Sequence, residues 1–158
     1  MKKRVVTLMI LALVLVLTAC NSETKKPGFD SEKIKNEILT KYNELNGLVD
    51  NAKVDLWDTY FLNHPGIGNT HNDHTNIGWE TFHNAIIKDK SLPNNERLYA
   101  ESYDITVYPI NESTAWVKGK IKMIFPDKKI SNNYFYDSLI KTKDGWRVFN
   151  SVVNSISD

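Results

Sequence analysis

Residues 114–125 have the sequence TAWVKGKIKMIF, in which every second residue from Ala115 onward is small or apolar. Lys118, Lys120 and Lys122 lie between these apolar positions. Successive side chains of a β-strand point to opposite faces of the sheet, so one face of this segment is apolar and the other is basic. The pattern predicts a strand that covers a core with one face and meets water with the other.

Three more strands are expected beside this one, because apolar and polar residues also alternate over residues 98–110, 130–142 and 146–156. Short segments rich in turn-forming residues separate them, such as Lys143-Asp144-Gly145 before the last strand. Four strands joined by short turns form an antiparallel meander.

The residues that precede the sheet have a helical spacing instead. A cap at Asp30 or Ser31 is followed by apolar residues at every third or fourth position up to about residue 50. A second, shorter helix is expected around residues 54–61 and a third over residues 79–90. Residues 64–78 have no period and predict a loop with room for a short hairpin.

Composition limits the class of protein. The chain has 158 residues, 41% hydrophobic and 25% charged, which suits one domain. Its 20 basic and 19 acidic residues leave no basic surface for a nucleic acid, and its single cysteine excludes a disulfide framework. Each element has one apolar face and there is no second sheet, so the expected class is α+β, with two to three N-terminal helices packed on a curved four-stranded antiparallel meander.

This order of elements resembles the nuclear transport factor 2-like superfamily, in particular its SnoaL-like branch. Gly78-Trp79 at the start of the third helix and Lys143-Asp144-Gly145-Trp146 in the last hairpin carry the resemblance, which covers about residues 31–156. It implies a cone-shaped roll with a pocket inside. It also implies that an enzyme of this type would use a pocket carboxylate or histidine as general base, with a tyrosine or a protonated acid opposite the developing oxyanion.

The N-terminal residues predict export. Lys2, Lys3 and Arg4 precede an apolar run over residues 5–17, and this run of about 13 residues is shorter than the roughly 20 that a membrane-spanning helix needs. Leu17-Thr18-Ala19-Cys20, which follows directly, resembles the lipobox of bacterial lipoproteins.

The chain is therefore expected to divide into a lipoprotein signal peptide over residues 1–19, a flexible tether over residues 20–29 and the folded domain over residues 30–158. Acyl chains, palmitate among them, on Cys20 would hold the protein in the lipid bilayer at the outer face of the bacterial cell membrane.

Glu101 and His83 are the candidate catalytic bases. Alternation places Glu101 on the strand face of Tyr103 and Val107, which we expect to face the helices, although a glutamate near a strand end is also typical of a solvated charge. His83 follows Trp79 by four residues on the third helix, so it faces either the cone's mouth or the edge of the apolar stripe.

Three histidines lie close together in the expected loop, namely His64, His71 and His74. Three protein ligands and one open position would make a hydrolytic zinc site. No helix fixes the rings of His71 and His74, so a polar loop is the favoured interpretation. We expect no metal and no cofactor.

Several side chains could line a ligand pocket, although at helical or alternating spacing such aromatic residues are more often plain core. The candidates are Trp57, Tyr60, His83, Tyr103, Tyr134 and Asn150. The last strand lacks the histidine that many SnoaL-like proteins carry after the tryptophan, and the Asn150 amide suits ligand orientation better than proton transfer.

The favoured function is non-catalytic binding of a small apolar or amphipathic ligand, or of a protein partner, by a membrane-anchored extracytoplasmic lipoprotein. One alternative is a cofactor-free isomerase, lyase or hydrolase with a pocket Glu or His as general base. Another is a structural or interaction module at the cell envelope, in which the outer sheet face around Trp116 forms a homodimer or partner surface.

Overall fold

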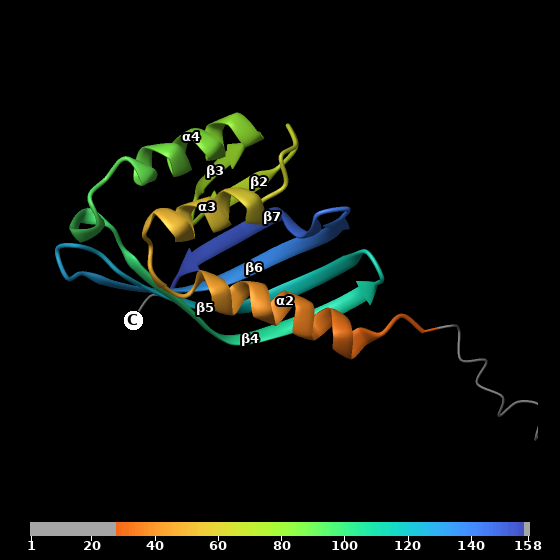
Figure 1. Cartoon of the computed structure of the whole chain (residues 1–158). Coiled ribbons are helices and arrows are strands. Elements are labelled where there is room, and N and C mark those ends of the chain that lie inside the picture. The colour runs from red at the N-terminus through yellow and green to blue at the C-terminus, as the bar shows by residue number, and fades with distance from the viewer. Residues whose placement is uncertain (1–27, 157–158) are drawn as a thin grey trace, which may run out of the picture.

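The computed structural model describes residues 28–156 (Figure 1). The expected signal peptide, Cys20, most of the expected tether, and residues 157–158 lie outside this range. Phe29, the last residue assigned to the tether, packs against the main core. The folded domain therefore begins no later than Phe29.

The described helices follow the predicted order. They are α2 (Ser31–Leu45), α3 (Asn51–Tyr60), α4 (Trp79–Lys90) and the short 3₁₀ helix η1 (Asn94–Glu96). Asp30 caps α2 by accepting a hydrogen bond from the backbone N–H of Lys33 at 2.9 Å, and Asp50 caps α3 in the same way at 3.0 Å. No helix within residues 28–156 is long and apolar enough to cross a membrane.

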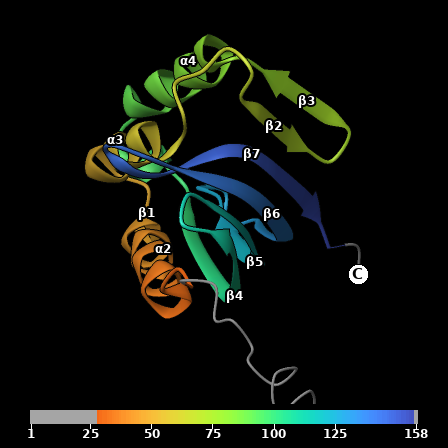
Figure 2. The same cartoon turned by 90° about the vertical axis from the view of Figure 1, so that its right-hand side faces the viewer.

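The sheet contains the predicted meander and three short additional strands. The meander consists of β4 (Tyr99–Asn111), β5 (Thr114–Ile124), β6 (Ile130–Thr142) and β7 (Gly145–Ser155). β1 (Gly47–Leu48) extends the β4 edge, and β2 (Gly68–His71) pairs in parallel with β7. β3 (His74–Ile77) completes a hairpin with β2 beyond β7, which Figure 2 shows, so the expected loop over residues 64–78 contains this hairpin.

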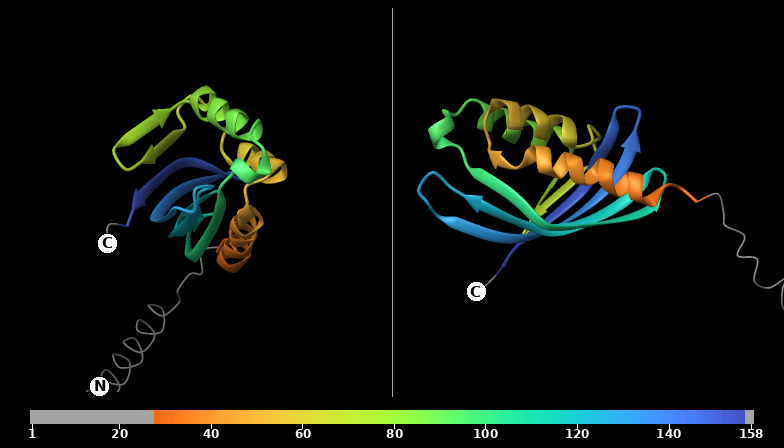
Figure 3. Two further views of the ribbon diagram at one scale, coloured as in Figure 1. Left: turned by 90° about the vertical axis from the view of Figure 1, so that its left-hand side faces the viewer. Right: turned by 60° about the horizontal axis from the view of Figure 1, so that its bottom comes forward.

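The helices lie along one side of the curved sheet (Figures 1 and 3). The main core joins α2 to the sheet, and its most buried side chains include Ile38, Leu139, Trp146 and Val148. A second cluster, which includes Val54 and Ile86, packs beneath α3 and α4. The expected α+β class, with helices packed on a curved antiparallel-rich sheet, is confirmed.

A β-bulge in β4 overturns the expected orientation of Glu101. The pairing with β5 shifts between Tyr103 and Thr106, and Asp104 adopts a φ of 52° there. One extra residue reverses which side chains face the core. Before the bulge the inward residues are therefore Ala100 and Ser102, whereas Glu101 and Tyr103 lie on the opposite face.

A second bulge, in β7, also reverses which side chains face the core. Ser138 of β6 pairs with Asn150, but Leu139 pairs with Val148, so Phe149 is the extra residue. Trp146 and Val148 face the core before the bulge, and Ser151 and Val153 face it afterwards. Asn150, which unbroken alternation would place on the same face as Trp146, and Val152 therefore lie on the outer face of the sheet.

Candidate ligand-binding site

A cavity of about 380 Å³ lies between α2, α3, α4 and the inner face of the sheet. Most of its wall is apolar, and that wall includes Leu45, Phe61, Phe82, Ile121, Met123 and Phe135. A mostly apolar pocket of this size with a few polar groups is typical of a small-molecule site.

Among the described residues that line this cavity, Asp137 is the one acidic residue. It lies on β6 between Phe135 and Leu139, and only 8% of it is exposed. The hydroxyl of Tyr42, from the last turn of α2, donates a hydrogen bond to Oδ2 of Asp137 at 2.5 Å. α2 and β6 therefore hold a phenol and a carboxyl group together inside an apolar enclosure.

Burial raises the pKa of Asp137 from its usual 3.8 to about 6, while the neighbouring hydroxyls of Ser151 and Tyr42 act in the opposite direction. Burial also raises the pKa of Tyr42, and the nearby charge of Asp137 raises it further. The pKa of Tyr60 is raised by burial and by Asp137 in the same way. The carboxyl group can therefore change its charge near neutral pH, whereas the two phenols remain protonated.

Three polar atoms of the wall residues are buried without a hydrogen-bond partner among the described residues. They are Nε1 of Trp57, the hydroxyl of Tyr60 and Oδ1 of Asp137. Buried polar groups in proteins nearly always have a partner, and an unpaired one costs about 1–3 kcal/mol. Three of the four such side-chain atoms in the described residues belong to this one wall, so the unpaired hydrogen-bonding capacity of the core is concentrated beside the cavity.

Aromatic packing fixes the positions of the two phenols. The ring of Tyr42 stacks on Phe135 with centroids 5.4 Å apart, and the ring of Tyr60 meets Tyr42 edge-on at the same separation. Gly119 makes room for this stack, because a Cβ atom at that position would lie 2.7 Å from Phe135. Gly119, on β5, thus also shapes the site.

The cavity lining also includes polar side chains from α2's C-terminal end and from β2. Asn46 follows α2, accepts a hydrogen bond from the backbone N–H of Ser102 at 2.7 Å and donates one to its carbonyl at 3.2 Å. Asn69 and His71 reach the wall from β2. Asn46 is thus occupied in joining α2 to β4, which fixes this part of the wall.

The structure brings together only some of the expected pocket residues. Trp57 and Tyr60 line the cavity. Tyr134 is 42% exposed and lies on the other side of the sheet, and the two bulges place Tyr103 and Asn150 on that side as well. These three residues do not line the cavity, because strand alternation directs them away from it.

Glu101 and His83, the candidate catalytic bases of the enzyme alternative, lie elsewhere. Glu101 is exposed on the outer face of β4. His83 lies on α4 outside the cavity wall, where its Nδ1 is 2.6 Å from Oδ1 of Asp58 and its ring stacks on Trp79 at 5.1 Å. His83 joins α4 to α3 and is not placed to act on a molecule in the cavity.

The three histidines that were considered as metal ligands do not converge. His71 and His74 face each other across the β2–β3 hairpin and are exposed, and Nδ1 of His64 accepts a hydrogen bond from the backbone N–H of Gly66. Within residues 28–156, no three His, Cys, Asp or Glu side chains form a group that could hold a metal ion.

Sequence reasoning missed Asp137 and Tyr42. The signal for Asp137 was present in the strand over residues 130–142, where it alternates with Phe135 and Leu139 and so places a carboxyl group on an apolar face. Tyr42 is one of the residues at every third or fourth position of the first expected helix, but nothing in the sequence shows that it meets Asp137, 95 residues away.

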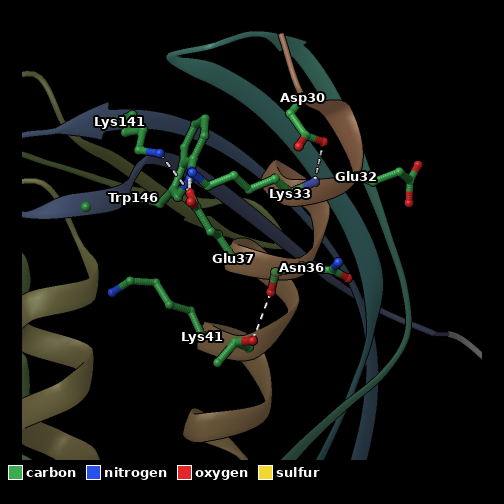
Figure 4. Close-up of a pocket in the computed structure, with 10 residues that line it drawn as sticks. Asp30, Glu32, Lys33, Asn36, Glu37, Lys41, Lys141 and Trp146 are labelled. Atoms are coloured by element: carbon green, nitrogen blue, oxygen red, sulfur yellow. Dashed lines mark hydrogen bonds and ion pairs between the residues drawn. The ribbon is translucent and has the colours of Figure 1, made fainter.

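A wider groove of about 930 Å³ runs along α2 beside the β6–β7 hairpin (Figure 4). Its central carboxylate, Glu37, accepts hydrogen bonds from Lys141 Nζ at 2.8 Å and from Trp146 Nε1 at 2.9 Å. These two bonds lower the pKa of Glu37. The charge of Glu37 is therefore already paired, and its two contacts join α2 to the β6–β7 hairpin.

No family model and no curated protein matches the chain. Solved structures do match the chain. A nuclear transport factor 2-like superfamily protein from Salmonella enterica aligns with a TM-score of 0.63 at 14% identity, over 81% of this chain and 94% of its own. The chain has the nuclear transport factor 2-like fold.

Two further structures share the nuclear transport factor 2-like fold with this chain at 10% identity. A candidate scytalone dehydratase from Novosphingobium aromaticivorans aligns with a TM-score of 0.64, over 77% of this chain and 83% of its own. A candidate ketosteroid isomerase from Parabacteroides distasonis aligns with a TM-score of 0.56, over 76% of this chain and 86% of its own. Proteins named as enzymes therefore occur among the structures with this fold.

Proposed function

We propose that the protein binds a small, mainly apolar molecule that carries hydrogen-bonding atoms, and that the cavity around Asp137 is the binding site. The observation that carries this proposal is the set of three unpaired polar atoms, on Trp57, Tyr60 and Asp137, in a mostly apolar wall. These atoms have almost no exposed surface, so a ligand would reach them after the wall side chains shift; its oxygen would then accept from the indole and the phenol, and its hydroxyl would donate to the carboxylate. The apolar wall would then supply affinity, and the three polar atoms would supply orientation.

The proposed place of action is the outer face of a bacterial membrane. The basic residues 2–4, the apolar run over residues 5–17 and the lipobox-like sequence that ends at Cys20 support export and acylation. A Cys20→Ser substitution tests this part separately. We expect the variant to lose acylation and membrane retention, and unchanged processing at the same site with unchanged retention would contradict it.

Ligand binding can be tested with 2-naphthol, a fluorescent bicyclic molecule with one hydroxyl group, and with naphthalene, which lacks that group. The purified protein is expected to bind 2-naphthol more tightly. Tyr60→Phe should weaken 2-naphthol binding about threefold to tenfold and leave naphthalene binding unchanged, because it removes one neutral hydrogen bond and no apolar surface.

Tyr134→Phe is the matched control, because it removes the same hydroxyl from the opposite side of the sheet. It should change neither affinity. Equal affinities for the two probes in the wild type, or equal effects of the two substitutions, would show that the cavity does not recognise polar groups.

A second candidate function is cofactor-free proton transfer in the same cavity, and it rests on the pKa of about 6 at Asp137 beside the phenol of Tyr42. An ionised Asp137 can take a proton from a carbon next to a ligand carbonyl, while the Tyr60 hydroxyl donates a hydrogen bond to the carbonyl oxygen. This assignment replaces Glu101 and His83, neither of which lines the cavity.

Exchange of the α-protons of 2-tetralone in D₂O, followed by NMR, separates binding from catalysis. A catalyst should accelerate the exchange, with a rate that rises as the pH passes about 6 and Asp137 ionises. Asp137→Asn should return the exchange to the buffer rate, and Tyr134→Phe should not change it. A wild-type rate equal to that of buffer excludes this second function for such ketones and leaves the binding proposal intact.

A further inference from the structure

We propose that the ligand of the cavity is an organic cation, whose ammonium group lies beside Asp137 and whose apolar part lies among the aromatic rings of the wall. This inference rests on the proposed function, because it names the class of molecule that the same cavity binds. The proposed function itself requires only a mainly apolar molecule with hydrogen-bonding atoms, so the two can be tested apart.

Asp137 is a buried acidic residue without a basic partner. None of the ion pairs among the described residues includes it. Its Oδ2 accepts a hydrogen bond from the neutral hydroxyl of Tyr42, and its Oδ1 has no partner within residues 28–156. With a pKa of about 6, the group is mostly ionised at pH 7.5. A buried charge without a partner is costly, so a cationic ligand gains affinity by supplying the missing charge.

The charges around the cavity favour a cation over an anion. Among the described residues that line it, none is a lysine or an arginine, and the one imidazole belongs to His71, which is exposed on β2. The ammonium group of Lys41 lies 5.5 Å from the ring centroid of Tyr60, but Lys41 lines the groove along α2 and not the cavity. An anionic ligand would therefore be repelled by Asp137 with little to offset the repulsion.

Aromatic side chains from α2, α3, α4 and the sheet line the cavity, and the faces of such rings attract cations. The ring of Tyr60 meets the ring of Tyr42 at 82° and the ring of Phe61 at 87°, with centroids 5.4 and 5.7 Å apart. Rings set nearly at right angles form the sides of a cage, an arrangement in which proteins hold ammonium groups. The same rings pack against the apolar part of the ligand.

The carboxylate attracts an ammonium group before the two are in contact. Oδ1 of Asp137 has almost no exposed surface, so direct contact requires the wall side chains to shift. The attraction between two charges falls only as the inverse of their distance, and it is stronger in apolar surroundings than in water. A cation that enters the cavity is therefore stabilised by Asp137 even before the wall rearranges.

The other two unpaired atoms of the wall define the rest of the ligand. Nε1 of Trp57 can only donate a hydrogen bond, so it requires an acceptor in the ligand. The hydroxyl of Tyr60 can accept from an ammonium group or donate to that acceptor. A cavity of about 380 Å³ is at the small end of ligand pockets. The expected ligand is therefore a small amine that also carries a hydrogen-bond acceptor.

Isothermal titration calorimetry of the full-length protein at pH 7.5 tests the inference with two probes that share a naphthyl group. They are 2-naphthylmethylamine, which is a cation at this pH, and 2-naphthylmethanol, in which a hydroxyl group replaces the ammonium group. The wild type is expected to bind the amine about tenfold more tightly or better. Asp137→Asn should abolish this preference and change the affinity for the alcohol by less than about threefold, because it removes the charge and keeps the shape of the side chain.

Proton release gives a second readout, which a merely structural role of Asp137 would not produce. At about pH 6 half of the Asp137 groups carry a proton, and a bound cation should expel it. Binding of the amine should then release up to about half a proton, measured as a dependence of the binding enthalpy on the ionisation enthalpy of the buffer. Tyr42 and Tyr60 stay protonated because their pKa values are raised. Asp137→Asn should abolish the release, which distinguishes Asp137 from His71 as the source of the proton.

Asp104→Asn is the matched control, because it removes the same charge from the opposite side of the sheet, and because Asn also tolerates the φ of 52° at that position. This variant should keep the preference for the amine. Equal affinities of the wild type for the two probes, or tighter binding of the alcohol, would overturn the inference and leave the proposed function in place. Binding of neither probe would overturn both. A preference that survives Asp137→Asn, or that Asp104→Asn abolishes as well, would show that Asp137 does not recognise the cation.

Discussion

The ionisation of Asp137 should make the free energy of unfolding depend on pH in a way that one substitution removes. In the folded protein this carboxyl group has a pKa of about 6, raised by burial from the usual 3.8 that the unfolded chain has. The folded state therefore favours the protonated group. Its contribution to stability is fully present below about pH 4 and is lost as the pH rises to about 6.

The shift of about two pKa units fixes the size of the effect. One unit corresponds to about 1.4 kcal/mol, so the free energy of unfolding should fall by about 3 kcal/mol across this pH range because of Asp137 alone. Asp137→Asn keeps the shape of the side chain and a hydrogen-bond acceptor for Tyr42, but it cannot ionise. The free energy of unfolding of the variant should therefore lack the pH-dependent contribution of Asp137.

Urea unfolding of the wild type and of Asp137→Asn, measured from pH 4 to pH 7.5, gives the result as a difference between two curves. The subtraction is necessary because other carboxylates act with the opposite sign. Glu37 has a lowered pKa, so its contribution is present at neutral pH and is lost as the pH falls. The Asn variant should become more stable relative to the wild type as the pH rises, and a flat difference would refute a raised pKa at Asp137.

Three further substitutions test the parts that support the site. Gly119→Val should destabilise the protein by about 1–3 kcal/mol in urea unfolding and weaken 2-naphthol binding, because the new side chain displaces Phe135. Asn46→Ala should lower the free energy of unfolding by about 1–3 kcal/mol, because it leaves the N–H of Ser102 without a partner. Glu37→Gln should change it by less than about 1 kcal/mol and leave binding unchanged, since its ion pair lies at the surface.

Side-chain periodicity predicted the elements well because each element in this chain has one clean apolar face. The helix over residues 79–90 matches α4, and alternation over residues 114–125 places Val117 inside and Trp116 outside, as the structure does. These features depend on residues a few positions apart. Local spacing is sufficient to specify them.

Periodicity failed where a strand changes its face partway along. Tyr103 and Asn150 were expected toward the helices, and each lies next to a one-residue bulge that reverses the alternation. No glycine marks either bulge. Asp104, at a φ of 52°, occupies a conformation that Asp adopts more readily than most residues, but a single Asp in a strand is too weak a signal to locate a bulge.

The same two bulges also create the site. Because β4 reverses at Asp104, Ser102 faces the cavity in the half of the strand next to Asn46, while Val107 in the other half still packs into the core beneath α2. β7 reverses at Phe149, so Ser151 comes beside the carboxyl group of Asp137. An unbroken alternation would have placed the amide of Asn150 inside and both serines outside. The segments that sequence reasoning misplaced are therefore those whose reversal brings Ser102 and Ser151 to the inner face, the second of them beside the carboxyl group of Asp137.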